Sequence, residues 1–253
     1  ALARTFGLQF SRVQFTADLM PSDLIGVSLY EREKAGFSFH PGPVFAQVLL
    51  ADEINRAGPK TQSALLEAME EHQVSVDGVS HALPEPFFVI ATQNPSEQLG
   101  TYPLPESQLD RFLMCISLGY PDRAAERELL MGEDSRDLIR ALKAVMTPQD
   151  LIAIQAEVRT LHASPALLDY LQALIAATRS GQWFAEGLSP RAGLSVLRAA
   201  RARALLDGRD FVAPDDVQAI LAPTIAHRLK PRSGSGRGAV EQVRAMLEAI
   251  PIP

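Results

Sequence analysis

The sequence has little cysteine, no long apolar run and no excess of positive charge. Its one cysteine, Cys115, excludes a disulfide framework and a cysteine-based zinc module, and is typical of a reducing compartment, so we expect a cytoplasmic protein. No apolar run approaches the roughly 20 residues that span a bilayer, and no secretion signal opens the chain; we expect no membrane insertion. A net charge of -6 is the wrong sign for a protein that binds mainly a phosphate backbone, so we expect no nucleic-acid partner.

The composition is that of a globular protein, with 47% hydrophobic and 21% charged residues over 253 positions. In the first half, short apolar runs alternate with helix-like stretches, which predicts an α/β layer. The runs predicted as strands are residues 10–15, 45–51, 87–92 and 112–118. The last two are almost entirely apolar, so we expect both to be buried on both faces of a parallel sheet, with Cys115 in the core.

Three further features are legible between these runs. Residues 59–72 carry Leu65, Leu66 and Met69 at helical spacing, which predicts an amphipathic helix. In residues 73–83, polar and apolar residues alternate on either side of an Asp-Gly pair, and this pattern predicts a β-hairpin. The Gly-rich segment 36–43 predicts a loop or a short hairpin.

From about residue 121 the sequence predicts helices only. Helix starts are indicated by capping side chains followed in most cases by proline, at Asp122, Thr147, Ser164 and Ser189. We therefore expect a first domain over residues 1–145 and an all-helical domain over residues 146–253.

Two adjacent carboxylates, Asp52 and Glu53, end the second apolar run. Ligands of parallel sheets gather beyond the carboxyl ends of the strands, so both acids should face the ligand. In phosphoryl-transfer sites the first acid holds Mg²⁺, usually through water, and the second polarises the attacking water. The alternative is that both acids are the solvated start of the next helix.

Three more side chains fit an anionic ligand. Asn94 follows the next strand, where its amide could reach the same water or a terminal phosphate, unless it only forms a turn before proline. Arg111 is either a structural partner of Asp110 or an arginine finger directed at a neighbouring subunit. Arg191 lies in the first turn of a helix, where positive charge is unfavourable without an anionic partner such as a phosphate.

Taken together, VLLADEINRA, ATQNP, GTYPLPESQLDRF and LSPRA resemble the MoxR-like family of AAA+ ATPases. The resemblance covers nearly the whole chain and extends to DLIG at 23–26, FHPGPVF at 39–45 and GRDFVAPDDV at 208–217. It implies an α/β fold: an AAA+ P-loop NTPase core, with a parallel sheet and flanking helices, followed by an all-helical lid domain.

The resemblance also implies roles for single residues. Asp52 corresponds to the Walker B acid that holds Mg²⁺ through water, and Glu53 to the acid that acts on the hydrolytic water. Asn94 corresponds to sensor 1, Arg111 to the arginine finger and Arg191 to sensor 2. ATP and Mg²⁺ are thus the implied cofactors, with Asp52, Glu53, Asn94 and Arg191 binding the nucleotide and its metal.

Other implied features concern assembly. Arg56 would contribute at the subunit interface, segment 36–43 resembles the helix-2 insert and segment 73–83 the pre-sensor-1 hairpin. Members of this clade form hexameric rings and act as chaperone-like remodelers or metal-insertion helpers, often beside proteins with a von Willebrand A domain. The resemblance thus implies a homo-oligomer with a protein partner.

One motif of the family is missing. The phosphate-binding loop G-x-x-x-x-G-K-[ST] is absent, and Gly58-Pro-Lys60-Thr61 lacks the glycine loop and follows the wrong strand. Residues 1–7 look like the middle of the helix that follows this loop, so we expect the first strand and the loop upstream of residue 1 and an inactive 253-residue chain. Two alternatives are a non-catalytic ring or adaptor module and a DNA-dependent or magnesium-chelatase-like motor.

Overall fold

The chain folds into two compact units in the computed structural model, which describes residues 1–33, 35–93, 100–132, 139–232, 236 and 238–252. Unit 1 comprises Ala1–Arg111 with Glu128–Ala153, and unit 2 comprises Phe112–Arg127 with Ile154–Pro253. The domain division at residue 145 stays a prediction.

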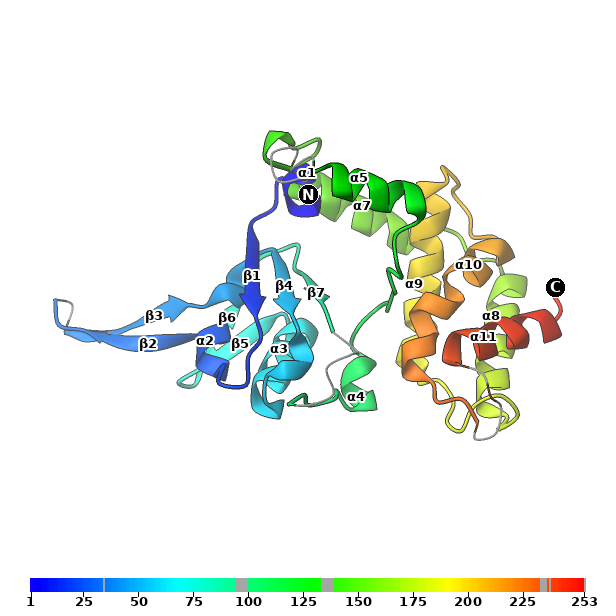
Figure 1. The fold of residues 1–253 in the computed structure, drawn as a ribbon, viewed down its shortest axis with the longest axis horizontal. Coiled ribbons are helices and arrows are strands. Elements are labelled where there is room, and N and C mark those ends of the chain that lie inside the picture. The colour runs from blue at the N-terminus through cyan, green and yellow to red at the C-terminus, as the bar shows by residue number, and fades with distance from the viewer. Residues whose placement is uncertain (34, 94–99, 133–138, 233–235, 237, 253) are drawn as a thin grey trace. The chain divides into compact units, whose positions relative to one another are not determined.

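A parallel sheet of three strands, in the order β1-β4-β7, forms the centre of unit 1 (Figure 1). The strands are β1 (Phe10–Gln14), β4 (Val48–Asp52) and β7 (Phe88–Ala91), which confirms three of the four predicted strands. Asp52 is opposite Gln14 on one side, and Ala51 is opposite Ala91 on the other. The carboxyl ends of the strands therefore lie at one edge of the sheet.

Strands β4 and β7 differ in how deeply their side chains are buried. In β4, Val48, Leu49 and Ala51 are all buried, as expected for a central strand. In β7, Phe88 is 50% and Ile90 38% exposed, so the prediction that this strand is buried on both faces is wrong. The reason is its position: among the described strands, β7 is at the edge of the sheet, with β4 on one side.

The fourth predicted strand is absent. Residues 112–118 have no strand structure and belong to unit 2, where the amide of Cys115 donates to Pro223 O at 2.8 Å. Arg228 Nη2 donates to Phe112 O at 2.7 Å. A strand needs a neighbouring strand for its backbone hydrogen bonds, and this segment takes helical partners instead. Cys115 is consequently exposed and not in the core.

The remaining elements of unit 1 surround the sheet. Two are antiparallel hairpins: β2–β3, which extends away from the sheet in Figure 1, and β5–β6, which turns through Asp77 and Gly78 at φ 51° and 79° and confirms the predicted hairpin. Their bounds are β2 (Gly26–Glu31), β3 (Gly36–Pro41), β5 (Gln73–Val76) and β6 (Val79–Ala82). The helices and turns are α1 (Leu2–Thr5), α2 (Pro21–Ile25), η1 (Pro43–Phe45), η2 (Ile54–Arg56), α3 (Pro59–Glu71) and α4 (Glu106–Leu109).

Helix α3 matches the predicted amphipathic helix. Leu65 and Leu66 are fully buried, while Glu67 on the opposite side is exposed. Thr61 in its first turn donates its hydroxyl proton to Leu19 O at 2.7 Å, so this Lys-Thr pair is part of a packed helix and not of a phosphate loop.

Unit 2 is helical in its described residues. Its elements are α8 (Pro165–Arg179), α9 (Pro190–Leu206), α10 (Pro214–Ile225), η3 (Ala226–Arg228) and α11 (Ala239–Ala249), whereas α5 (Arg123–Met131) and α7 (Pro148–Thr160) contribute to both units. The predicted caps are confirmed: Ser164 Oγ and Ser189 Oγ accept from the amides of Leu167 and Ala192 at 3.2 Å and 3.1 Å. Asp122 and Thr147 accept from Ala125 and Asp150 in the same way. Within the described residues, every helix is too short or too polar to cross a bilayer.

An ion pair fixes the start of α10 in unit 2. Asp216 is 1% exposed and accepts hydrogen bonds from Arg209 Nη1 at 2.6 Å and Nη2 at 2.5 Å. Its carboxylate also accepts from the amide of Ala213 at 2.8 Å, at the N-terminus of the helix. The hydrogen bonds from Arg209 lower the pKa of Asp216 below its ordinary value.

We expect Asp216→Asn to destabilise unit 2 by about 2 to 4 kcal/mol, because the buried acceptor of a charged pair is lost. Since the folded-state pKa is lowered, this stability is present above the unfolded pKa of about 3.9 and is lost as the pH falls through the folded pKa. Urea unfolding followed by the fluorescence of Trp183, the one tryptophan, measures it. Asp215→Asn, an exposed neighbour in the same helical turn, is the control; an equal loss in both variants would contradict the prediction.

Candidate functional site

Asp52 and Glu53 occupy the carboxyl end of β4, as the sequence predicts. Asp52 is the last residue of the strand, and its side chain is 15% exposed. Glu53 has a left-handed backbone, with φ 54° and ψ 49°, and η2 follows at once. A non-glycine residue in this region costs roughly 1 to 3 kcal/mol and is common at functional sites. The turn ends the strand abruptly and brings both carboxylates to the edge of the sheet.

Thr92, directly after β7, links the two acids. Its hydroxyl donates to Asp52 Oδ1 at 2.9 Å and accepts from the backbone amide of Glu53 at 3.0 Å. The backbone is joined at the same place, since the amide of Ile54 donates to Thr92 O at 3.0 Å. One residue of the adjacent strand therefore fixes both the Asp52 carboxylate and the turn that carries Glu53.

Each acid also pairs with an arginine. Arg12 on β1 reaches Asp52 Oδ2 through Nε at 2.6 Å and Nη2 at 2.5 Å, and its own side chain is 63% exposed. Arg56 Nε lies 3.0 Å from Glu53 Oε2. Such exposed pairs are weak, so both arginines can turn away when another ligand approaches.

The oxygens at this edge suit a magnesium ion. Asp52 provides one carboxylate, and no group of three or more His, Cys, Asp or Glu side chains suited to a metal occurs in the part of the chain that the structure describes. Mg²⁺ characteristically binds one or two carboxylates and takes its remaining ligands from water and substrate phosphates. The residues present therefore fit Mg²⁺ bound together with a phosphate ligand better than an all-protein metal site.

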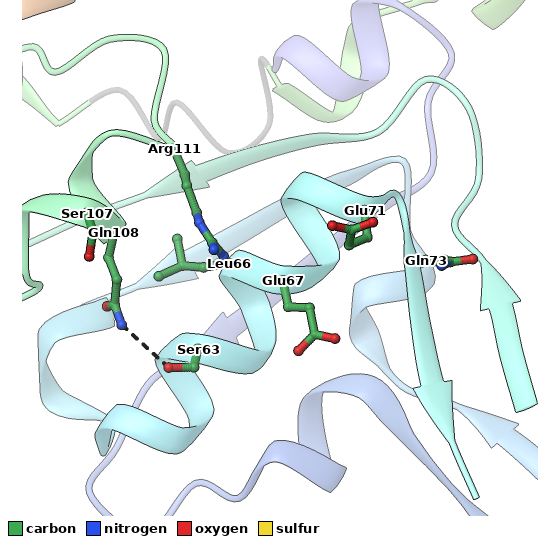
Figure 2. Close-up of a pocket in the computed structure, with 8 residues that line it drawn as sticks. All are labelled: Ser63, Leu66, Glu67, Glu71, Gln73, Ser107, Gln108 and Arg111. Carbon is green, nitrogen blue, oxygen red and sulfur yellow. Dashed lines mark hydrogen bonds between the residues drawn. The ribbon is translucent and has the colours of Figure 1, made fainter. Parts of the chain in front are cut away.

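Arg111 follows α4 and lines a pocket of about 610 Å³ on the surface of α3 (Figure 2). Its Nη2 lies 2.9 Å from Glu70 Oε2, and both side chains are 30% exposed. Figure 2 also shows Gln108 donating to Ser63 Oγ, at 3.4 Å, which ties α4 to α3. The structure thus holds Arg111 on the surface of unit 1 by an ion pair with Glu70.

The other two predicted site residues, Asn94 and Arg191, do not belong to the described part of unit 1. Asn94 lies outside the described residues. Arg191 is exposed in the first turn of α9 in unit 2. Their roles as sensors stay predictions.

Sequence reasoning missed Thr92, Arg12 and Glu70. Thr92 could have been found, because it ends the predicted strand 87–92, and the acids Asp52 and Glu53 directly follow the predicted strand 45–51. Arg12 carries a weaker signal, as a charge within a strand-like run. Glu70 carries none, because its pairing depends on how α4 lies on α3.

Comparisons with known proteins identify the family of the chain. Residues 1–114 match the ATPase family associated with various cellular activities (AAA), and residues 176–250 match the AAA lid domain. The chain is 45% identical to the uncharacterized protein YeaC of Bacillus subtilis, over 100% of the chain and 80% of that protein. It is 44% identical to the chaperone MoxR1 of Mycobacterium tuberculosis, over 90% of the chain but 62% of that protein.

Two further relatives are informative. Protein MoxR of Paracoccus denitrificans is 35% identical, over 100% of this chain and 82% of that protein. The crystal structure of a proposed ATPase from Cytophaga hutchinsonii has a TM-score of 0.88 and 37% identity, over 100% of this chain and 80% of that one. A parallel sheet bearing two acids, a helical unit and these matches lead to one conclusion: the chain belongs to the MoxR-like family of AAA+ ATPases.

Proposed function

We propose that the chain is part of a Mg²⁺-dependent ATPase that couples ATP hydrolysis to the remodeling or maturation of a protein partner. The observation that supports this most strongly is the hydroxyl of Thr92, bonded at once to Asp52 Oδ1 and to the amide of Glu53. A solvated helix start would not need a residue beside the neighbouring strand to fix the Asp52 carboxylate and the backbone of Glu53. A site for water activation beside a metal does need it.

The proposed roles follow from position. Asp52 would bind the water shell of Mg²⁺, with Thr92 holding the orientation of its carboxylate. Glu53 would accept a hydrogen bond from the attacking water and so orient it, and Arg56 pairs with that carboxylate when no water is engaged. When bound, ATP would supply the phosphoryl group, and its phosphates together with water would supply the remaining ligands of the metal. Asn94 and Arg191 are proposed to contact its phosphates.

The phosphate-binding loop is proposed to lie on a segment outside the 253 residues. In the described part of the chain, β7 exposes Phe88 and Ile90, and Ile116 and Leu118 in the apolar run 112–118 are 73% and 92% exposed. An additional parallel strand would continue the sheet beside β7, and the helix that follows such a strand would cover side chains on a face of the sheet. The apolar run 112–118 also has no strand partner among the described residues. The chain alone is therefore proposed to be inactive.

The proposal includes assembly and partners. We propose that the protein forms a homo-oligomeric ring of six subunits, the number that the resemblance to the MoxR-like family implies. In this ring, Arg111 would leave Glu70 and contact the nucleotide of the next subunit. A chaperone role is supported by the 44% identity to a protein named as a chaperone. Metal insertion, a partner with a von Willebrand A domain and a cytoplasmic location are finer proposals that rest on the resemblance and the composition.

The second candidate is a related motor or a non-catalytic module. The chain is 30% identical to the magnesium-chelatase 38 kDa subunit of Acidiphilium rubrum, over 79% of the chain and 58% of that protein, which favours a motor of that kind as the runner-up. A non-catalytic adaptor would have no use for the orientation of Glu53. Titration with a fluorescent ATP analogue and Mg²⁺ separates the cases: an adaptor does not bind it in either the 253-residue chain or the full-length gene product.

We expect Glu53→Gln in the full-length protein to lower turnover by about a hundredfold or more while the affinity for the ATP analogue stays the same, because the amide cannot orient water as the carboxylate does. Phosphate release measures turnover. Glu248→Gln, an exposed acid on α11, should leave it unchanged. Full turnover in Glu53→Gln would contradict the assigned role.

Thr92→Val should lower turnover by about tenfold, because the donor to Asp52 and the acceptor for the Glu53 amide both disappear at constant side-chain shape. Thr92→Ser retains the hydroxyl and is the matched control. The Mg²⁺ concentration for half-maximal rate should also rise in the valine variant. If serine and valine variants are equally slow, the hydroxyl is not the cause.

Arg111→Ala should lower turnover by about a hundredfold or more without preventing assembly, measured by light scattering. Arg244→Ala, an exposed position on α11, is the control. Subunits carrying Arg111→Ala and subunits carrying Glu53→Gln are each slow. Mixing them should restore part of the activity, since some interfaces then contain both intact residues. Inactivity at every mixing ratio would count against a role on the neighbouring subunit.

A further inference from the structure

One buried amide lies directly behind the proposed water-activating turn. Gln62, in the first turns of α3, is 1% exposed. Its Nε2 lies 3.2 Å from Ile54 O, 3.1 Å from Ala57 O and 2.9 Å from Tyr102 O. A single buried NH₂ group thus lies within hydrogen-bond distance of three backbone carbonyls, which belong to two segments of the chain. Buried carbonyls without a donor are costly, so these contacts are strongly constrained.

The two segments are both parts of the candidate site. Ile54–Arg56 is the turn η2 that begins directly after Glu53, and Tyr102 precedes α4 and Arg111. They are also joined to each other, since the amide of Tyr102 donates to Asn55 O at 2.6 Å. Through Gln62, helix α3 therefore holds together the turn that follows Glu53 and the segment that leads to Arg111.

We infer that Gln62 is a positioning residue for hydrolysis, which sets the orientation of Glu53 and the placement of Arg111 through these three carbonyls. This inference rests on the proposed function. Gln62 does not touch nucleotide or water; it acts through the backbone. Its removal should therefore slow the chemical step and leave nucleotide binding unchanged, because misplacement of a reacting group by a fraction of an ångström affects turnover before affinity.

The test uses Gln62→Met in the full-length protein, which retains an unbranched side chain of similar length and removes the donor. We expect kcat to fall about tenfold to a hundredfold, with KM for ATP within about twofold. In the 253-residue chain, hydrogen exchange should increase in residues 54–57 and 100–111 and remain unchanged in α8 to α11.

The matched control is Gln242→Met. Gln242 is another buried glutamine, 6% exposed, whose Nε2 donates to the carbonyl of Trp183 in unit 2 at 3.2 Å. It should lose comparable stability and retain kcat. An equal fall of kcat in both variants, or faster exchange in Gln62→Met with kcat unchanged, would overturn the positioning role.

Gln62→Glu keeps the test decisive if the methionine variant does not fold. Its protonated carboxyl can donate to one carbonyl, whereas its carboxylate faces three carbonyl oxygens, which raises its pKa above the ordinary value of about 4.3. Turnover relative to the unchanged protein should therefore fall as the pH rises from about 5 to 8. A pH-independent ratio overturns the inference. Absence of turnover in the unchanged full-length protein instead refutes the proposed function, and the inference with it.

Discussion

The parallel pairing of β4 with β7 is the constraint on which the rest of the site depends. It places Asp52 and Thr92 at the same edge, so that the threonine hydroxyl reaches both the Asp52 carboxylate and the Glu53 amide. A slip of one residue would turn Thr92 to the opposite face of the sheet and separate these groups. The buried side chains of β4 specify the register, so core packing and site geometry have one common cause.

Local signals in the sequence predicted most elements of the fold. The β5–β6 hairpin follows from Asp77 and Gly78, which tolerate a positive φ, and the starts of α8 and α9 follow from Ser164 and Ser189 followed by proline. These features depend on a few adjacent residues. They are legible without any knowledge of tertiary structure.

The errors arise where partners are distant in the chain. Residues 112–118 have the composition of a buried strand, but composition does not specify which backbone provides the hydrogen bonds, and here Pro223 and Arg228 of the helical unit do so. The site shows the same limit. Asp52 and Glu53 could be predicted from their place after a strand, whereas the pairing of Arg111 with Glu70 depends on the seating of α4 on α3.

Polar side chains that take no part in the proposed chemistry, one exposed and one buried, matter as much as the acids for the geometry of this candidate site. Asp52 and Glu53 are adjacent in sequence, yet their geometry depends on Thr92 from the neighbouring strand and on Gln62 from the following helix. A carboxylate on an unsupported turn would sample many orientations. The free-energy cost of ordering it would then arise when substrate binds and would weaken binding. Hydrogen bonds to backbone carbonyls and amides fix the turn beforehand, because they hold the main chain and not only the side chain. What the fold provides at this edge is therefore a fixed backbone for the turn that carries Glu53, and under the proposed function this fixed position would matter more than the presence of a second acid.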